Sequence, residues 1–194
     1  MNRGVAFAIS VGLLLLAVSA SYWLYSFKKN QLPILETLGG NFSLPSTLGR
    51  ELSLDQFHGK VVLLNFGYTT CPDVCPTVLA RMRTVLERLA GRAERVQPVF
   101  ITIDPSRDSV EKLAAYLHFF HPSFIGMRGD LQQTKKIADL YRVHYKKELI
   151  DSAMEYGFLH NDHIYLLDQR GRVRAMYSGA TRVEVMAEEI ATLL

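Results

Sequence analysis

Cys71 and Cys75 are the only two cysteines of the chain, and they carry its clearest chemical signal. They stand four positions apart, where a strand-like run ends and a helix-like pattern begins. Pro76 suits the first turn of that helix, because a proline there loses no hydrogen bond. The spacing differs from that of Cys-x-x-Cys redox motifs and of zinc-ribbon cysteine couples. The pair therefore predicts either a thiolate metal site or a dithiol switch.

The position of the two cysteines favours thiolate chemistry. Unpaired backbone N–H groups and the positive end of the helix dipole lower the pKa of a thiol at a helix N-terminus. Thiolates are soft ligands that suit copper, and Cu(I) in particular, with zinc as the alternative metal. Asp73 opposes thiolate formation but attracts a cation. A purely structural disulfide is the other alternative, although a bridge over three residues restrains the unfolded chain little.

The N-terminus carries an uncharged apolar run from Val5 to Phe27. Such a run can cross a hydrocarbon core of about 30 Å as a helix, so we expect a membrane anchor over residues 1–29. Small residues around Ala20 leave a cleavable signal peptide as the alternative. Aromatic residues and then Lys28 and Lys29 follow that point, which favours a retained anchor. Basic groups flank the run on both sides, so charge leaves its orientation open.

Charge and length describe the rest of the chain. The 22 Lys and Arg exceed the 19 Asp and Glu by three, and three of the basic residues precede residue 30. The remainder is neutral, which gives no electrostatic reason to expect nucleic acid as a partner. We expect a tether over residues 30–40 and one domain over residues 41–194, a length that can bury a sizeable core.

Strand and helix patterns alternate along this domain, which predicts an α/β fold with a central mixed sheet flanked by helices. Asp108 and Glu111 form a capping-box pattern for one of the helices. No element is assigned between Lys146 and Leu159, where we expect a mobile loop. The expected elements are a small hairpin in 42–54, a strand over 61–66, a helix from the cysteines to about 91, a strand over 96–103, helices over 108–120 and 131–141, a hairpin of 163–167 with 172–177, and a helix over 183–194.

The order of elements, with cysteines at the first strand-to-helix turn, resembles the thioredoxin fold. Several motifs together resemble the Sco/SenC family of membrane-anchored copper proteins. In that family two cysteines and a histidine bind copper, and the resemblance maps these ligands onto Cys71, Cys75 and His163. The motifs that carry it are Phe66-Gly67-Tyr68-Thr69-Thr70-Cys71-Pro72-Asp73-Val74-Cys75-Pro76, Ile103-Asp104-Pro105-Ser106-Arg107-Asp108, Phe124-Ile125-Gly126, Tyr141-Arg142-Val143 and Asp162-His163.

The resemblance also implies a function. It implies a copper chaperone that carries Cu(I), with Cu(II) as a second form, and that helps to assemble the CuA centre in subunit II of cytochrome c oxidase. A second copper chaperone or a thiol reductase is a further expected partner. The resemblance also implies a single-pass anchor in the inner membrane, with the domain in the periplasm or the mitochondrial intermembrane space. The alternative is a thiol–disulfide oxidoreductase, in which Cys71 and Cys75 are catalytic and reduce the target's cysteines before metal arrives.

Other residues are weaker candidates. His160 precedes His163 by three positions and is a rival ligand, although a surface position is the simpler interpretation. Asp162 is a candidate for orienting the ring of His163. Asp104, Arg107 and Asp108 either brace a helix, or order the metal site or face a partner, as the resemblance implies for their loop.

Overall fold

The computed structural model describes residues 3–29, 32–149 and 155–194. The chain divides into two compact units, Met1–Leu32 and Pro33–Leu194. The first unit contains helix α1 (Arg3–Lys29), in agreement with the helix expected there. Within the described ranges, no helix has both the length and the apolar character that a membrane span requires. The predicted transmembrane anchor is thus not confirmed by the structure.

The second unit is built around a five-stranded mixed sheet with the strand order β5-β4-β3-β8-β9. The first three of these strands are parallel, whereas β8 and β9 run antiparallel to their neighbours. The strands are β3 (Val61–Gly67), β4 (Val96–Thr102), β5 (Ile125–Met127), β8 (Ile164–Leu167) and β9 (Val173–Tyr177). Every residue of β3 and β4 is buried, which explains why both read as continuous apolar runs.

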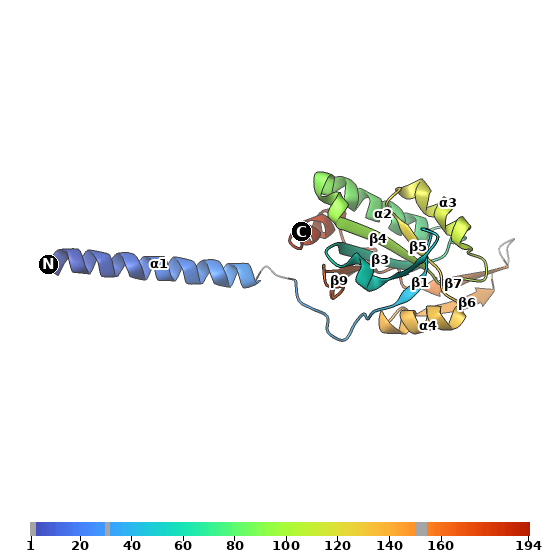
Figure 1. The fold of residues 1–194 in the computed structure, drawn as a ribbon, viewed down its shortest axis with the longest axis horizontal. Helices are drawn as coiled ribbons and strands as arrows, with labels where there is room; N and C mark the ends of the chain where they lie inside the picture. Colours follow the sequence, from blue (N-terminus) through green and yellow to red (C-terminus); the bar gives the residue numbers. More distant parts are fainter. Residues whose placement is uncertain (1–2, 30–31, 150–154) are drawn as a thin grey trace. The chain divides into compact units, whose positions relative to one another are not determined.

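Helices cover both faces of this sheet, as Figure 1 shows for α2 and α3 on one side and α4 on the other. Alternate residues of β3, such as Leu64 and Phe66, lie in one apolar cluster with Ile137 and Tyr141 from the α4 region. The helices are α2 (Val74–Leu89), α3 (Val110–Phe120), α4 (Leu131–Leu140) and α5 (Val183–Ala191), with short 3₁₀ turns at Leu54–Phe57 and Ala90–Arg95. The predicted α/β fold with a central mixed sheet is confirmed.

Two small hairpins complete the unit. The first, β1 (Ser43–Pro45) with β2 (Glu51–Ser53), lies where the hairpin of residues 42–54 was expected. The second pairs β6 (Tyr145–Leu149) with β7 (Tyr156–His160) as a separate two-stranded sheet. The prediction that residues 146–159 lack regular structure was therefore wrong outside 150–154, which lie beyond the described residues. The hairpin has a weak sequence pattern, because most residues of β6 are exposed and apolar and polar residues therefore do not alternate along it.

The start of α3 also differs from the expected capping box at Asp108. Ser109 is the N-cap, and its side chain accepts a hydrogen bond from the backbone N–H of Lys112. The side chain of Asp108 is fully buried and instead accepts from Thr69 and Thr102. A carboxylate that pairs with distant hydroxyls is no longer available to cap its own helix.

Candidate metal centre

The two cysteines lie where β3 passes into α2, as the sequence predicted. Cys71 is half-buried in the loop, whereas Cys75 lies in the first turn of α2 and is 1% exposed. Gly67 ends β3 directly beside the second sulfur. A Cβ atom added at Gly67 would lie 2.8 Å from the Cys75 sulfur and 2.9 Å from the ring of Phe100. The lack of a side chain at this glycine therefore makes room for the Cys75 sulfur.

The Cys71 sulfur is strongly acidified. A hydrogen bond from the Cys75 thiol is the largest cause that lowers the pKa of Cys71 from 9.0 to about 3. A hydrogen bond from the His160 side chain contributes next, followed by the backbone N–H groups of Cys75, at 3.4 Å from the sulfur, and of Asp73. The two backbone N–H groups lie at the start of α2, so the expected effect of a helix N-terminus is present.

The second thiol behaves in the opposite way. Its hydrogen bond to Cys71, its burial and the negative charge on Cys71 all raise the pKa of Cys75 above its usual value. Near neutral pH the two sulfurs thus share one proton and carry one negative charge. A pair of this kind attracts a soft cation, and binding of a metal by both sulfurs releases the remaining proton.

His160 provides a nitrogen beside the sulfurs. This residue ends β7, and its Nε2 atom lies 3.6 Å from the Cys75 sulfur. Its Nδ1 atom lies 2.9 Å from the backbone oxygen of Asn161, which can only accept a hydrogen bond. Nδ1 therefore carries a hydrogen, and Nε2 faces the sulfur, as a donor in the protonated ring and with its lone pair in the neutral ring. This arrangement, in which one ring nitrogen donates to a carbonyl, is typical of metal-binding histidines.

His163, the ligand implied by the family resemblance, is differently placed. Its Nδ1 atom lies 3.0 Å from the side-chain nitrogen of Asn161. The side-chain oxygen of Asn161 accepts from the backbone N–H of His144, so its nitrogen is the atom that faces the ring. Nδ1 of His163 is thus an acceptor already in use. Asn161, and not the predicted Asp162, forms the hydrogen bond to this ring.

The donor atoms of Cys71, Cys75 and His160 all lie within 4.8 Å of one another, and this is the metal-type cluster found among the described residues. Donors about 2.3 Å from one ion lie at most about 4.6 Å apart, so small movements would let all three reach a single metal. Two sulfurs and one imidazole are the donor set that suits copper. His163 is not part of this cluster, and its assignment as a ligand stays a prediction.

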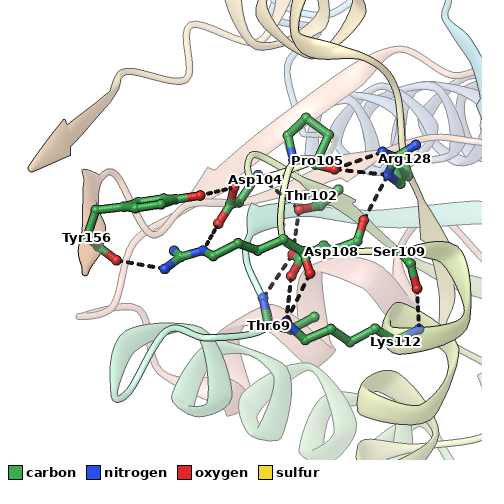
Figure 2. A network of polar contacts seen from close by, with 10 residues as sticks. Thr69, Thr102, Asp104, Pro105, Asp108, Ser109, Lys112, Arg128 and Tyr156 are labelled. Atoms are coloured by element: carbon green, nitrogen blue, oxygen red, sulfur yellow. Dashed lines mark hydrogen bonds and ion pairs between the residues drawn. The ribbon is translucent and has the colours of Figure 1, made fainter. Parts of the chain in front are cut away.

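The loop after β4 contacts this site from the side. The buried Asp108 accepts hydrogen bonds from the backbone N–H and the hydroxyl of Thr69, at 3.0 and 2.5 Å, and from the hydroxyl of Thr102 at 2.6 Å (Figure 2). Thr69 precedes Cys71 by two positions, so Asp108 orders the cysteine loop. Asp104 and Arg107 contact Tyr156 of β7. The prediction that this loop orders the surroundings of the site agrees with these contacts.

Two aromatic residues of the site were missed by the sequence analysis. Tyr68 is 3% exposed, and its ring contacts the rings of Phe158 and His160 at centroid distances of 5.4 and 6.0 Å. Its hydroxyl accepts a hydrogen bond from the backbone N–H of Phe158 at 3.2 Å. The second missed aromatic residue is Tyr156, which lies in strand β7. The alternation of Tyr156, Phe158 and His160 could have identified this strand and its shared face, because alternate residues of a strand point to the same side.

Comparison with known proteins agrees with this architecture. The SCO1/SenC family profile matches residues 31–194. An SCO2-like protein of Rickettsia felis is 35% identical over 96% of both chains. The mitochondrial SCO2 homologue of Bos taurus is 37% identical over 78% of this chain, which spans 58% of that protein.

Solved structures give the same result. Arabidopsis thaliana ScoI with copper bound has a TM-score of 0.75 and 30% identity, over 80% of this chain and 97% of that one. Bradyrhizobium japonicum ScoI with copper bound has a TM-score of 0.74 and 34% identity, over 81% of this chain and 99% of that one. The profile covers most of the chain, and the Rickettsia felis relative is 35% identical over 96% of it. The chain belongs to the SCO1/SenC family.

Proposed function

We propose that this protein is a copper chaperone that binds copper through Cys71, Cys75 and one histidine. The observation that supports the proposal is the convergence of two sulfurs and the lone pair of His160 within 4.8 Å. Copper is bound in the ScoI structures of Arabidopsis thaliana and Bradyrhizobium japonicum, which share this fold. The soft sulfurs favour Cu(I), and Cu(II) is a second form that the same donors can hold.

Two histidines compete for the third position. His160 has the favourable geometry, whereas His163 is the ligand that the family resemblance implies. Binding of a metal through Nδ1 of His163 requires that this nitrogen first lose its contact with Asn161. We propose His160 as the imidazole that first meets the metal, and we keep His163 as the alternative.

The proposed role is delivery of copper to the CuA centre in subunit II of cytochrome c oxidase. A carrier needs few ligands and an accessible site, so that incoming ligands can replace its own. The half-buried Cys71 and His160 meet this need. The uncharged run from Val5 to Phe27 supports a single-pass anchor in the inner membrane, with the domain in the periplasm or an equivalent compartment. A second copper chaperone or a thiol reductase is proposed as the partner that prepares the site.

Thiol–disulfide exchange is the second candidate function, and the acidified Cys71 favours it. The Cys71 thiolate would attack a disulfide of the target and release one target thiolate. Cys75 would then lose its proton and attack the Cys71 sulfur, releasing the second target thiolate. The target gains two electrons, and a Cys71–Cys75 disulfide is left on this protein.

Copper binding by matched variants tests the proposal. The purified protein is compared with Cys71→Ser, Cys75→Ser, His160→Ala and His163→Ala, and with His58→Ala, an exposed histidine paired with Asp55, as the control. Competition with a Cu(I) chelator measures affinity, and the visible sulfur-to-Cu(II) charge-transfer band reports thiolate ligation. We expect both cysteine variants to lose the band and His160→Ala to bind more weakly than the control. Full affinity in both single histidine variants, with rapid reduction of a disulfide substrate, would favour the exchange function.

A further inference from the structure

The hairpin of β6 and β7 carries His160 at the end of its second strand. The hairpin forms its own two-stranded sheet, separate from the central sheet. Its position against the domain therefore depends on side-chain contacts, and not on a continuous backbone ladder. Whatever holds this hairpin in place also holds the imidazole beside the sulfurs.

Arg107 makes the principal polar contact between the domain and this hairpin. Its guanidinium carbon lies 3.6 Å from the centre of the Tyr156 ring, and its Nη1 atom donates to the backbone oxygen of Tyr156 at 2.9 Å. The Nζ atom of Lys147 lies 3.5 Å from the centre of the same ring. Two cations at such short distances occupy opposite faces of the ring, so Tyr156 is held between them.

Asp104 fixes this arrangement because it contacts both Arg107 and Tyr156. Its side chain is 3% exposed, pairs with Nε of Arg107 and accepts a hydrogen bond from the Tyr156 hydroxyl at 3.0 Å. Figure 2 shows the Tyr156 hydroxyl directed at Asp104. A buried carboxylate with two partners resists the loss of either, because an unpaired charge would remain. Asp104, Arg107 and Tyr156 are called the hairpin latch.

The latch is connected to the imidazole through one face of β7. Tyr156, Phe158 and His160 alternate along the strand, and successive rings of Tyr156, Phe158 and Tyr68 are in contact. Tyr68 contacts His160 in turn. A shift of Tyr156 is therefore transmitted along rigid, packed rings to His160.

We propose that Arg107 is a positioning residue, which through Tyr156 holds the β6–β7 hairpin closed and so keeps His160 at Cys71 and Cys75. With the latch closed, the imidazole completes the three-donor site. With the latch open, the hairpin moves away, and the two sulfurs are left to incoming ligands. This inference rests on the proposed copper-binding function for its consequence, but the closure itself is a property of the metal-free protein.

Hydrogen exchange of the metal-free protein tests the closure directly. The backbone N–H of Phe158 donates to the Tyr68 hydroxyl, so its protection reports docking of the hairpin on the domain. We expect Arg107→Ala to speed exchange at Phe158 about tenfold, and Arg107→Lys, which keeps the charge but not the planar group, to have a smaller effect. The control is Arg83→Ala, an arginine on α2 that is 42% exposed and pairs with Glu87. Unchanged exchange at Phe158 in Arg107→Ala would overturn the proposal.

A double-variant comparison tests whether Arg107 acts through His160. We expect Arg107→Ala to weaken Cu(I) binding about tenfold in the parent and to have no further effect in His160→Ala. Equal losses in both backgrounds would show that Arg107 does not work through this imidazole. If the parent itself fails to bind copper, the proposed function fails, whereas the exchange experiment still decides the latch. If Arg107→Ala does not fold, Tyr156→Phe serves in both experiments, since it removes only the hydroxyl that contacts Asp104, and we expect smaller changes of the same kind.

Discussion

The side-chain nitrogen of Asn161 lies 3.0 Å from Nδ1 of His163, and the backbone oxygen of the same residue lies 2.9 Å from Nδ1 of His160. One asparagine thus gives its two neighbouring histidines opposite tautomers. Nε2 of His160 faces the Cys75 sulfur at 3.6 Å, whereas the Nδ1 acceptor of His163 is occupied by Asn161. Of the two, His160 is the histidine that lies beside the sulfurs.

The first prediction concerns this asparagine. We expect His160→Ala to weaken Cu(I) binding about 10- to 100-fold, and Asn161→Ala in that background to recover part of the loss. The reason is that Nδ1 of His163 becomes free to bind once its donor is removed. Chelator competition measures the affinities, and adding His163→Ala to the double variant should abolish the recovery. No recovery at all would show that His163 cannot replace His160.

The second prediction concerns the reactivity of Cys71. With a pKa of about 3, this sulfur is a thiolate throughout the neutral range. Its alkylation by iodoacetamide should therefore stay nearly constant between about pH 6 and pH 8, whereas an ordinary thiol slows about tenfold for each unit below its pKa. Mass spectrometry of the labelled peptide measures the rate, and Cys75→Ala provides the comparison. This variant removes the thiol that donates to Cys71, which is the largest cause of the lowered pKa, and we expect the pH dependence to return in part.

The same shift predicts how stability depends on pH. The pKa of Cys71 falls from 9.0 in the unfolded chain to about 3 in the folded protein. A group whose pKa is lower in the folded protein stabilises the fold. This contribution is complete when the pH exceeds the pKa of the unfolded chain, and it is lost as the pH falls to the pKa of the folded protein. Cys75 has a raised pKa and is neutral in both states below pH 9, so it does not cancel this slope. Urea unfolding of the reduced protein should give a higher free energy at pH 8 than at pH 6, and Cys71→Ser should reduce the difference.

The fourth prediction concerns the space beside Cys75. Gly67→Ala puts a methyl group 2.8 Å from the sulfur and 2.9 Å from Phe100, so one of them must move. We expect a loss of about 1–3 kcal/mol in unfolding free energy and weaker copper binding. Gly91→Ala is the control, because no atom lies within 4 Å of the added methyl group. Equal stability and equal copper affinity in the two variants would contradict the tight packing at Gly67.

The fifth prediction concerns the buried carboxylate of Asp108. Asp108→Ala leaves the N–H and hydroxyl of Thr69 and the hydroxyl of Thr102 without their acceptor. We expect a loss of about 3–5 kcal/mol in unfolding free energy, measured by chemical denaturation. Asp139→Ala, which breaks an exposed pair with Lys135, should cost at most about 1 kcal/mol. A loss at Asp108 as small as that at Asp139 would show that the cysteine loop does not depend on this carboxylate.

Most of the fold could be predicted from the sequence. The runs that became β3 and β4 are apolar throughout, and the spacing of Val78, Met82 and Val85 is that of one helix face. Each pattern reflects the burial of one element, so it can be recognised in a short stretch of consecutive residues. The hairpin of β6 and β7 could not be recognised in the same way, because β6 exposes most of its side chains.

The sequence by itself determined the two sulfurs of the site. Cys71 and Cys75 are placed by a single strand-to-helix turn, so their spacing already implied that they act together. The tertiary structure alone decided which imidazole joins them. His160 and His163 differ by three positions on one short segment, and local pattern cannot separate them. Their roles depend on Asn161, on Tyr68 and on the contact between Arg107 and Tyr156, which join parts of the chain that are far apart in sequence.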